Sequence, residues 1–251
     1  MPLLDVSGID KKFGGLHAVN DVSFSVTKGQ IKAVIGPNGA GKTTLFNLIS
    51  GALDLGAGAV SFAGQEITGL KPFQISRCGM ARTFQNIKMF HGMTALENVK
   101  VGMHPRTKAG FIAGMLNLPS TWLEEQKIHD RAMELMHLLE IEEFADTTAT
   151  SLAFGQQRAV EFARALASDP KILLLDEPAA GLNIYETAEV ARLISKIQTQ
   201  GITVLLVEHD MSLVMDISDE IVVLSFGEKI AEGTPSEIQH NDDVIKIYLG
   251  E

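Results

Sequence analysis

The stretch GPNGAGKT at residues 36–43 constrains the fold more than any other part of the sequence. It fits the pattern G-x-x-x-x-G-K-[ST] and follows an apolar run, IKAVI at 31–35, that has the length of a strand. The residues after it have helical character up to Gly51, which can stop a helix. Glycines let backbone amides face phosphate oxygens without obstruction by a Cβ atom, and a helix N-terminus adds partial positive charge. We therefore predict a strand–loop–helix unit that binds the phosphates of a nucleotide, in preference to a plain glycine-rich turn.

The side chains of this loop predict separate roles. Lys42 is expected to reach the β- and γ-phosphates, and the hydroxyl of Thr43 is expected to bind Mg²⁺. The amides of the first helical turn, together with Thr44, are expected to hold the α- and β-phosphates. The loop residues that we expect to bind the nucleotide are Gly36, Pro37, Asn38, Gly39, Ala40, Gly41, Lys42, Thr43 and Thr44.

The order of apolar segments predicts an α/β fold. Residues 3–35 alternate apolar and polar positions, with turn signals, as an antiparallel sheet does. After residue 151, apolar strands such as KILLLDE and GITVLLVEHD alternate with helical stretches, which indicates a parallel sheet covered on both faces. Residues 86–150 are rich in helical patterns, with Ile128, Ala132, Leu135 and Leu139 at helical spacing. We expect a core with a β lobe in 1–85 and 151–251, and an inserted helical lobe in 86–150.

Composition narrows the functional class. The net charge of −10 argues against broad, non-specific binding of nucleic acid, which requires a basic surface. Cys78 is the only cysteine, so no disulfide can form within the chain and a reducing cytosol fits. We see no signal peptide at the N-terminus, and no stretch offers the ~20 apolar residues of a membrane span.

Two acidic residues end an apolar strand in KILLLDEP. Ligands of open α/β sheets bind at the carboxyl ends of the strands, so Asp176 can face the same Mg²⁺ as Thr43. Glu177 is then placed to polarise an attacking water, unless the pair is a solvated acidic turn. His209 follows the next strand, in VEHD, where it could contact the γ-phosphate and hold Glu177 in place, unless it is an ordinary surface histidine. Gln85 stands where the core meets the helical lobe and can contact Mg²⁺ or the lytic water, or play a purely structural part.

Taken in order, these residues resemble the nucleotide-binding subunit of an ABC transporter over essentially the whole chain. The set comprises aromatic Phe13 before Gly14, the loop at 36–44, Gln85, a LAFGQ signature at 152–156, the ILLLDE strand end, the AAGLN loop at 179–183, and His209. The resemblance implies one ABC ATPase domain over 1–251, built on a P-loop NTPase core.

The resemblance also implies roles and partners. Phe13 would stack on adenine, although it could simply pack in the β lobe; Glu177 would be the general base and His209 the switch histidine. Two subunits, identical or paralogous, would bind head to tail. Ala153, Gly155 and Gln156 of each signature would then face the ATP of the other subunit. Integral membrane permease subunits, and indirectly a periplasmic binding protein, would place the chain at the cytoplasmic face of the plasma membrane.

Two positions depart from the family pattern. Ala153 stands where the signature usually has serine, and Asn183 stands where the loop commonly ends in aspartate. A lost hydrogen bond costs roughly 1 kcal/mol, so we expect weaker dimer closure with an active site. Ser151 could cap the following helix, or Ala153 could begin it without a side-chain bond.

Within the family, the sequence is similar to ATP-binding subunits of branched-chain amino-acid importers. The shared features are ARTFQN, MTALENV, LAFGQQR, DEPAAGLN, VEHDM and the tail GTPSEI…VIKIYLGE. Urea and amide importers and lipopolysaccharide exporters share much of this pattern, so these functions stay open. A soluble ABC ATPase acting on ribosomes or chromosomes stays open too, as does a switch that binds nucleotide without hydrolysing it.

The helical lobe carries two further features. Seven of the ten methionines fall between 80 and 136, where they either form an adaptable interface or fill a small irregular core. They are Met80, Met89, Met93, Met103, Met115, Met133 and Met136. The apolar stretch FIAGMLNLP at 111–119 is a candidate contact with a permease.

Overall fold

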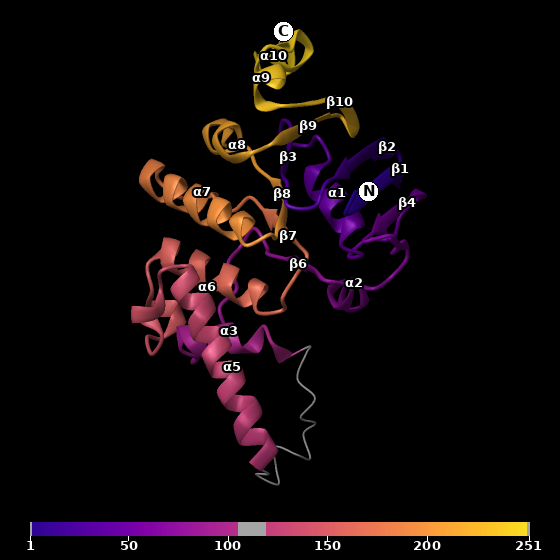
Figure 1. Cartoon of the computed structure of the whole chain (residues 1–251). Coiled ribbons are helices and arrows are strands. Elements are labelled where there is room, and N and C mark those ends of the chain that lie inside the picture. The colour runs from indigo at the N-terminus through magenta and orange to yellow at the C-terminus, as the bar shows by residue number, and fades with distance from the viewer. Residues whose placement is uncertain (1, 105–118, 250–251) are drawn as a thin grey trace. The chain divides into compact units, whose positions relative to one another are not determined.

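The computed structural model of the chain describes residues 2–104 and 119–249 (Figure 1). Contacts divide the chain into two compact units. The first comprises Met1–Gln85 and Lys171–Glu251, and the second is Asn86–Pro170. The sequence pattern places the end of the helical lobe at residue 150, whereas the compact unit extends to Pro170. The helix after the signature lies in the second unit because it packs against the other helices there.

The first unit contains a four-stranded antiparallel sheet, as the alternation of residues 3–35 predicts. Its strands lie in the order β2-β1-β4-β5. They are β1 (Leu4–Phe13), β2 (Leu16–Val26), β4 (Ala57–Phe62) and β5 (Gln65–Glu66). Alternate residues of β1, such as Leu4 and Val6, are buried beneath the sheet.

A six-stranded sheet forms the centre of the same unit, in the order β10-β9-β3-β8-β7-β6. Its strands are β3 (Ile31–Ile35), β6 (Met80–Arg82), β7 (Ile172–Asp176), β8 (Thr203–Val207), β9 (Glu220–Ser225) and β10 (Glu228–Gly233). Neighbouring strands pair in parallel except β10, which runs antiparallel to β9. The sheet is therefore mixed, because a two-residue hairpin joins its last two strands and a parallel pair needs a longer crossover.

Every residue of β3, β7 and β8 is buried, which explains their mostly apolar sequences. Helix α1 (Lys42–Ile49) presents Leu45, Phe46 and Ile49 to a hydrophobic core that both sheets share. Gly51 adopts a φ of 70° just after this helix, as expected for a stop position. The other helices of the unit are α2 (Pro72–Cys78), α7 (Ile184–Thr199), α8 (Met211–Ile217), α9 (Pro235–Gln239) and α10 (Asp242–Leu249).

The second unit is helical. Its helices are α3 (Ala95–Val101), α5 (Pro119–Leu138), α6 (Phe154–Leu166) and the short 3₁₀ turns η2 (Glu142–Phe144) and η3 (Ala149–Ser151). Helices α3, α5 and α6 pack on one another, and the helical spacing predicted around Ala132 and Leu135 is confirmed by their burial. In this unit Met89, Met103 and Met136 are buried, which favours the core-filling interpretation for them. The candidate contact at 111–119 lies outside the described residues except for Pro119.

Candidate active site

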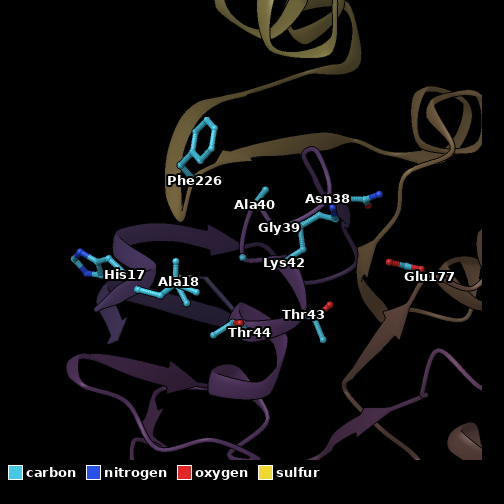
Figure 2. A pocket seen from close by; sticks show the side chains of 12 residues that line it. His17, Ala18, Asn38, Gly39, Ala40, Lys42, Thr43, Thr44, Glu177 and Phe226 are labelled. Carbon is cyan, nitrogen blue, oxygen red and sulfur yellow. The ribbon is translucent and has the colours of Figure 1, made fainter. Parts of the chain in front are cut away.

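A pocket of about 400 Å³ opens beside the glycine loop of the first unit (Figure 2). This volume is in the usual range for sites that bind small molecules. The residues that line it are Leu16, His17, Ala18, Asn38, Gly39, Ala40, Gly41, Lys42, Thr43, Thr44, Glu177 and Phe226. Figure 2 shows His17, Ala18 and Phe226 at one end of the pocket and Glu177 at the other, with the loop between them. Seven of the nine loop residues predicted from the sequence line this one cavity; Gly36 and Pro37 are not among them.

The loop holds its shape because glycine permits it. Gly41 directly precedes α1 with a φ of 100°, and a Cβ atom there would lie 2.4 Å from the carbonyl oxygen of Ala18. No other residue fits this conformation and this contact without a shift of the backbone. The N-terminus of α1, with its unpaired amides, therefore faces the pocket.

Lys42 is buried, and its Nζ donates hydrogen bonds to the carbonyl oxygens of Gly36 at 2.6 Å and Pro37 at 3.0 Å. Burial lowers the pKa of Lys42, while the carboxylates of Glu177 and Glu208 act in the opposite direction. The loop thus carries its own cation, fixed by two of its own carbonyl groups.

The carboxylate of Asp176 ends β7 and is buried. Its Oδ2 accepts a hydrogen bond from Nη2 of Arg82 at 2.8 Å, and Nη1 of Arg82 also donates to Asn47 and Ser50 of the α1 segment. Arg82 lies beside the rings of Phe46 and Phe84, with its guanidinium carbon 5.8 Å and 5.7 Å from their centroids. The arginine therefore connects the acidic strand end to the helix that follows the phosphate loop.

Glu177 comes next and lines the pocket. Its backbone has a φ of 47°, which is strained for a residue with a long side chain. Its Oε2 accepts a hydrogen bond from Nε2 of Gln85 at 2.7 Å, and Nδ1 of His209 lies 4.0 Å from the same oxygen. The structure thus places Gln85 and His209 beside Glu177, which lies at the end of the pocket away from Phe226 (Figure 2).

Glu208 is a residue that the sequence did not single out. It is fully buried, its Oε1 accepts from the amide of Ala179, and its Oε2 accepts from the amides of His209 and Asp210. These bonds connect the turn that follows Glu177 to the backbone of His209 and Asp210. A carboxylate directly before His209 was visible in the sequence, but its inward orientation depends on contacts with residues 29 positions away.

The donor atoms at this site fit a nucleotide-bound Mg²⁺. The Thr43 hydroxyl and the Asp176 carboxylate are hard oxygen ligands, which Mg²⁺ prefers. Thr43 lines the pocket, whereas Asp176 is not among the lining residues and directly precedes Glu177, which is. In the described part of the chain, no group of three or more acidic, histidine or cysteine side chains could hold a metal ion by itself. Mg²⁺ at phosphate sites usually takes one or two protein ligands together with phosphate oxygens and waters, so this small donor set is sufficient.

The signature residues lie in the second unit, at the start of α6. Ala153 begins the helix without a side-chain cap, and its amide donates to Oε1 of Gln156 at 3.0 Å. Ser151 donates its hydroxyl to the Thr148 carbonyl, so the interpretation in which Ser151 caps α6 is wrong. A Cβ atom built on Gly155 would meet nothing within 4 Å. The local structure therefore gives no steric reason for glycine at this position.

Two further predicted residues have clear positions. Phe13 is 46% exposed at the end of β1 and is not among the residues that line the pocket; Nζ of Lys11 lies 5.6 Å from its ring centroid. Asn183 caps α7 by accepting hydrogen bonds from the amides of Tyr185 and Glu186. Asparagine and aspartate are about equally good at this position, so the departure at Asn183 leaves the helix cap intact.

No helix among residues 2–104 and 119–249 has both the length and the apolar character to cross a membrane. The sequence model of the ABC transporter family matches residues 19–180, and that of the branched-chain amino acid ATP-binding cassette transporters matches residues 228–251. The chain is 47% identical over 251 residues to the high-affinity branched-chain amino acid transport ATP-binding protein BraF of Pseudomonas aeruginosa, covering all of this chain and 98% of that protein.

Solved structures agree with this relationship. An ATP-binding cassette of an ABC transporter in its ADP conformation superposes with a TM-score of 0.86 and 32% identity, over the full length of both chains. A dimeric ATP-binding cassette bound to ADP and phosphate has a TM-score of 0.76 and 25% identity, covering 92% of this chain and 98% of that one. The chain therefore belongs to the ABC transporter ATPases, in the group of branched-chain amino acid transport ATP-binding proteins.

Proposed function

We propose that the chain binds Mg²⁺-ATP in the pocket beside the glycine loop and hydrolyses it to drive the import of branched-chain amino acids. The observation that carries this proposal is the arrangement of Glu177 in one pocket with the phosphate loop and Lys42. The transport substrate comes from the similarity to BraF, whose name states branched-chain amino acid transport.

Binding begins at the phosphates. The amides of residues 38–44 and the partial charge at the N-terminus of α1 attract the phosphate oxygens. Lys42 would exchange its bonds with the Gly36 and Pro37 carbonyls for bonds to the β- and γ-phosphates. Thr43 and Asp176 would hold Mg²⁺, which neutralises the charge that develops on the phosphate oxygens during transfer.

Hydrolysis then requires a base beside the γ-phosphate. We assign Glu177 this role: its carboxylate takes a proton from a water molecule as the water oxygen bonds to the γ-phosphorus and the bond to ADP breaks. Gln85 donates to Oε2 of Glu177 and so orients the carboxylate. His209, whose Nδ1 is 4.0 Å from Glu177, is assigned the contact to the γ-phosphate.

The open backbone of the signature at 152–156 supports the proposal that a second subunit binds there. Glycine at position 155 leaves open space above its backbone, so another molecule can approach closely there. A related cassette is a dimer with ADP and phosphate bound. We propose that Ala153, Gly155 and Gln156 face the ATP of a second copy or of a paralogue. The assembled pair would act on membrane permease subunits at the cytoplasmic face of the membrane, where a periplasmic binding protein delivers the amino acid.

The test is Glu177→Gln, which keeps the size and the polar contact but removes the basic group. Turnover by the complex with its permease should fall about 10²–10⁴-fold, the usual contribution of a general base, while ATP binding persists and accumulates an ATP-bound dimer. Phosphate release and size-exclusion chromatography measure the two effects. Glu189→Gln, an exposed change on α7, is the matched control and should leave both unchanged. Wild-type turnover in the Glu177→Gln protein would exclude Glu177 as the base.

A further inference from the structure

The turn between β9 and β10 carries an aromatic residue where a polar one is usual. Ser225 pairs with Glu228 across the hairpin, so Phe226 and Gly227 form a two-residue turn. Both have positive φ, at 45° and 84°. Two-residue hairpin turns with this backbone strongly prefer asparagine, aspartate or glycine at the first central position, and a bulky residue there is an outlier.

Packing within the chain does not explain the phenylalanine. Its side chain is 90% exposed, so it contributes almost nothing to the hydrophobic core. A strained backbone conformation combined with an exposed aromatic ring points to a function for the ring outside the fold.

The turn is anchored to the nucleotide site. The amide of Gly227 donates to the carbonyl of Ala40 in the phosphate loop at 3.1 Å, and the amide of Asn20 in β2 donates to the carbonyl of Gly227 at 2.8 Å. A Cβ atom on Gly227 would lie 3.0 Å from the carbonyl oxygen of Ala18. These contacts fix the position of the Phe226 backbone relative to the loop.

The pocket has chemically different ends. Lys42, Thr43 and Glu177 form the polar part, whereas Phe226 lies at the opposite end with His17 and Ala18 (Figure 2). Leu16, which is 66% exposed and directly precedes His17, also lines the pocket. A nucleotide whose phosphates lie on the loop and whose γ-phosphate faces Glu177 has its base at the end with Phe226. Exposed side chains change rotamer within nanoseconds, so the Phe226 ring is free to lie against a bound base.

We infer that Phe226 binds the purine base of the nucleotide from the β9–β10 turn, as a contact additional to the one expected of Phe13. This inference rests on the proposed ATP site. The contact is stacking and apolar, so it strengthens binding of adenine and guanine nucleotides alike and leaves the phosphate contacts unchanged.

The experiment compares ADP with inorganic tripolyphosphate, which carries phosphates without a base. Calorimetric titration of Phe226→Ala should show ADP binding weakened about tenfold, the effect typical of one lost stacking contact, with tripolyphosphate binding unchanged. Phe73→Ala, which removes a phenylalanine that is 60% exposed on α2, is the matched control and should bind both ligands normally. GDP should weaken by the same factor as ADP in Phe226→Ala.

A second variant separates function from folding. Phe226→Asn places a preferred residue in the turn, so the nucleotide-free protein should melt roughly 2–4 °C higher, while ADP binding falls as in Phe226→Ala. If Phe226 served only to stabilise the fold, the Phe226→Asn protein would melt at a lower temperature than the wild type.

The outcomes are distinct. ADP binding by Phe226→Ala at wild-type strength, or equal loss of ADP and tripolyphosphate binding, would overturn the base contact while leaving the proposed ATP site in place. A lower melting temperature for Phe226→Asn would overturn the argument from backbone strain. Wild-type protein that bound neither ligand would overturn the proposed site itself.

Discussion

At the scale of single residues, Arg82 shows how the acidic strand end tolerates a buried charge. The side chains of Arg82 and Asp176 are only 12% and 6% exposed, and they form an ion pair at 2.8 Å. Removing one member of a buried pair leaves the other without its counter-charge and typically costs 3–5 kcal/mol. The arginine therefore stabilises the fold around the carboxylate that we assign to Mg²⁺.

We predict that Arg82→Ala lowers the free energy of unfolding by about 3–5 kcal/mol, measured by urea denaturation. Lys246→Ala, which removes an exposed partner of Asp243, is the control and should change it by under about 1 kcal/mol. Equal effects of the two substitutions would show that the buried pair with Asp176 contributes no more than a surface pair.

The lowered pKa of Lys42 makes the stability of the fold depend on pH. Burial lowers its pKa below the ordinary 10.5 of the unfolded chain, with Glu177 and Glu208 acting in the opposite direction. Between the folded and unfolded values, the unfolded chain holds a proton that the folded chain has released, so stability rises with pH across this alkaline window. Below the folded value both states are protonated, and Lys42 then adds no slope.

We expect Lys42→Met to remove this contribution. Urea unfolding of the nucleotide-free protein is measured at several pH values from neutrality to 10.5. The free energy of unfolding should rise more steeply with pH for the wild type than for the variant. The difference between the two curves isolates Lys42 from the other lysines, which titrate in both proteins. Parallel curves would mean that the lysine titrates alike in the folded and unfolded chains.

At the scale of elements, the start of α6 lacks a side-chain cap. Ala153 makes no side-chain bond at this position. A serine would accept a hydrogen bond from the first turn, which is worth about 1 kcal/mol, and would also supply the hydroxyl that the signature commonly presents to nucleotide.

We predict that Ala153→Ser, made in the Glu177→Gln background, raises the fraction of ATP-bound dimer in size-exclusion chromatography. The comparison with Ala153→Gly, which adds no hydroxyl, separates the serine contact from effects of the helix start. An unchanged or smaller dimer fraction would refute the role assigned to the missing hydroxyl.

Elements differ in how well the sequence predicts them. Apolar runs identify β3, β7 and β8 because every residue of these strands is buried. Strand β6 has three residues, too few for a periodic pattern, and β10 carries charged residues such as Glu228 and Glu232. The parallel sheet was therefore predicted, but its antiparallel edge was not.

In the candidate site too, the sequence predicts some residues and misses others. The loop and the acidic strand end are local patterns; the structure places Glu177 in the same pocket as the loop, and Gln85 and His209 lie beside Glu177. Arg82, Glu208 and Phe226 were missed because their roles depend on contacts between distant segments; Arg82 and Asp176 are 94 positions apart. Single residues of common types give no signal for such contacts until the chain is folded.

At the scale of the whole molecule, the two compact units differ in what they hold. All the residues that line the pocket belong to the first unit, Met1–Gln85 with Lys171–Glu251. A ligand stabilises the part of a protein that it binds by mass action, and units with separate cores can unfold separately.

We therefore predict two transitions in differential scanning calorimetry of the isolated chain, of which ADP shifts one upward. At an ADP concentration of about 100 times Kd, the free energy of unfolding of the binding unit increases by roughly 2.7 kcal/mol. Lys42→Met serves as the control, since it should reduce the shift. A single transition that moves as a whole would show that the two units unfold together.

The open space above Gly155 has a consequence for selection. Glycine near the start of a helix is less favourable than alanine by up to about 1 kcal/mol, and an alanine would fit here without touching anything in its own chain. The isolated chain thus gains nothing from glycine and loses helix stability by keeping it. Contacts within the chain therefore do not explain the glycine, whereas the second molecule that we propose at the signature would explain it, because only glycine lets that molecule reach the backbone.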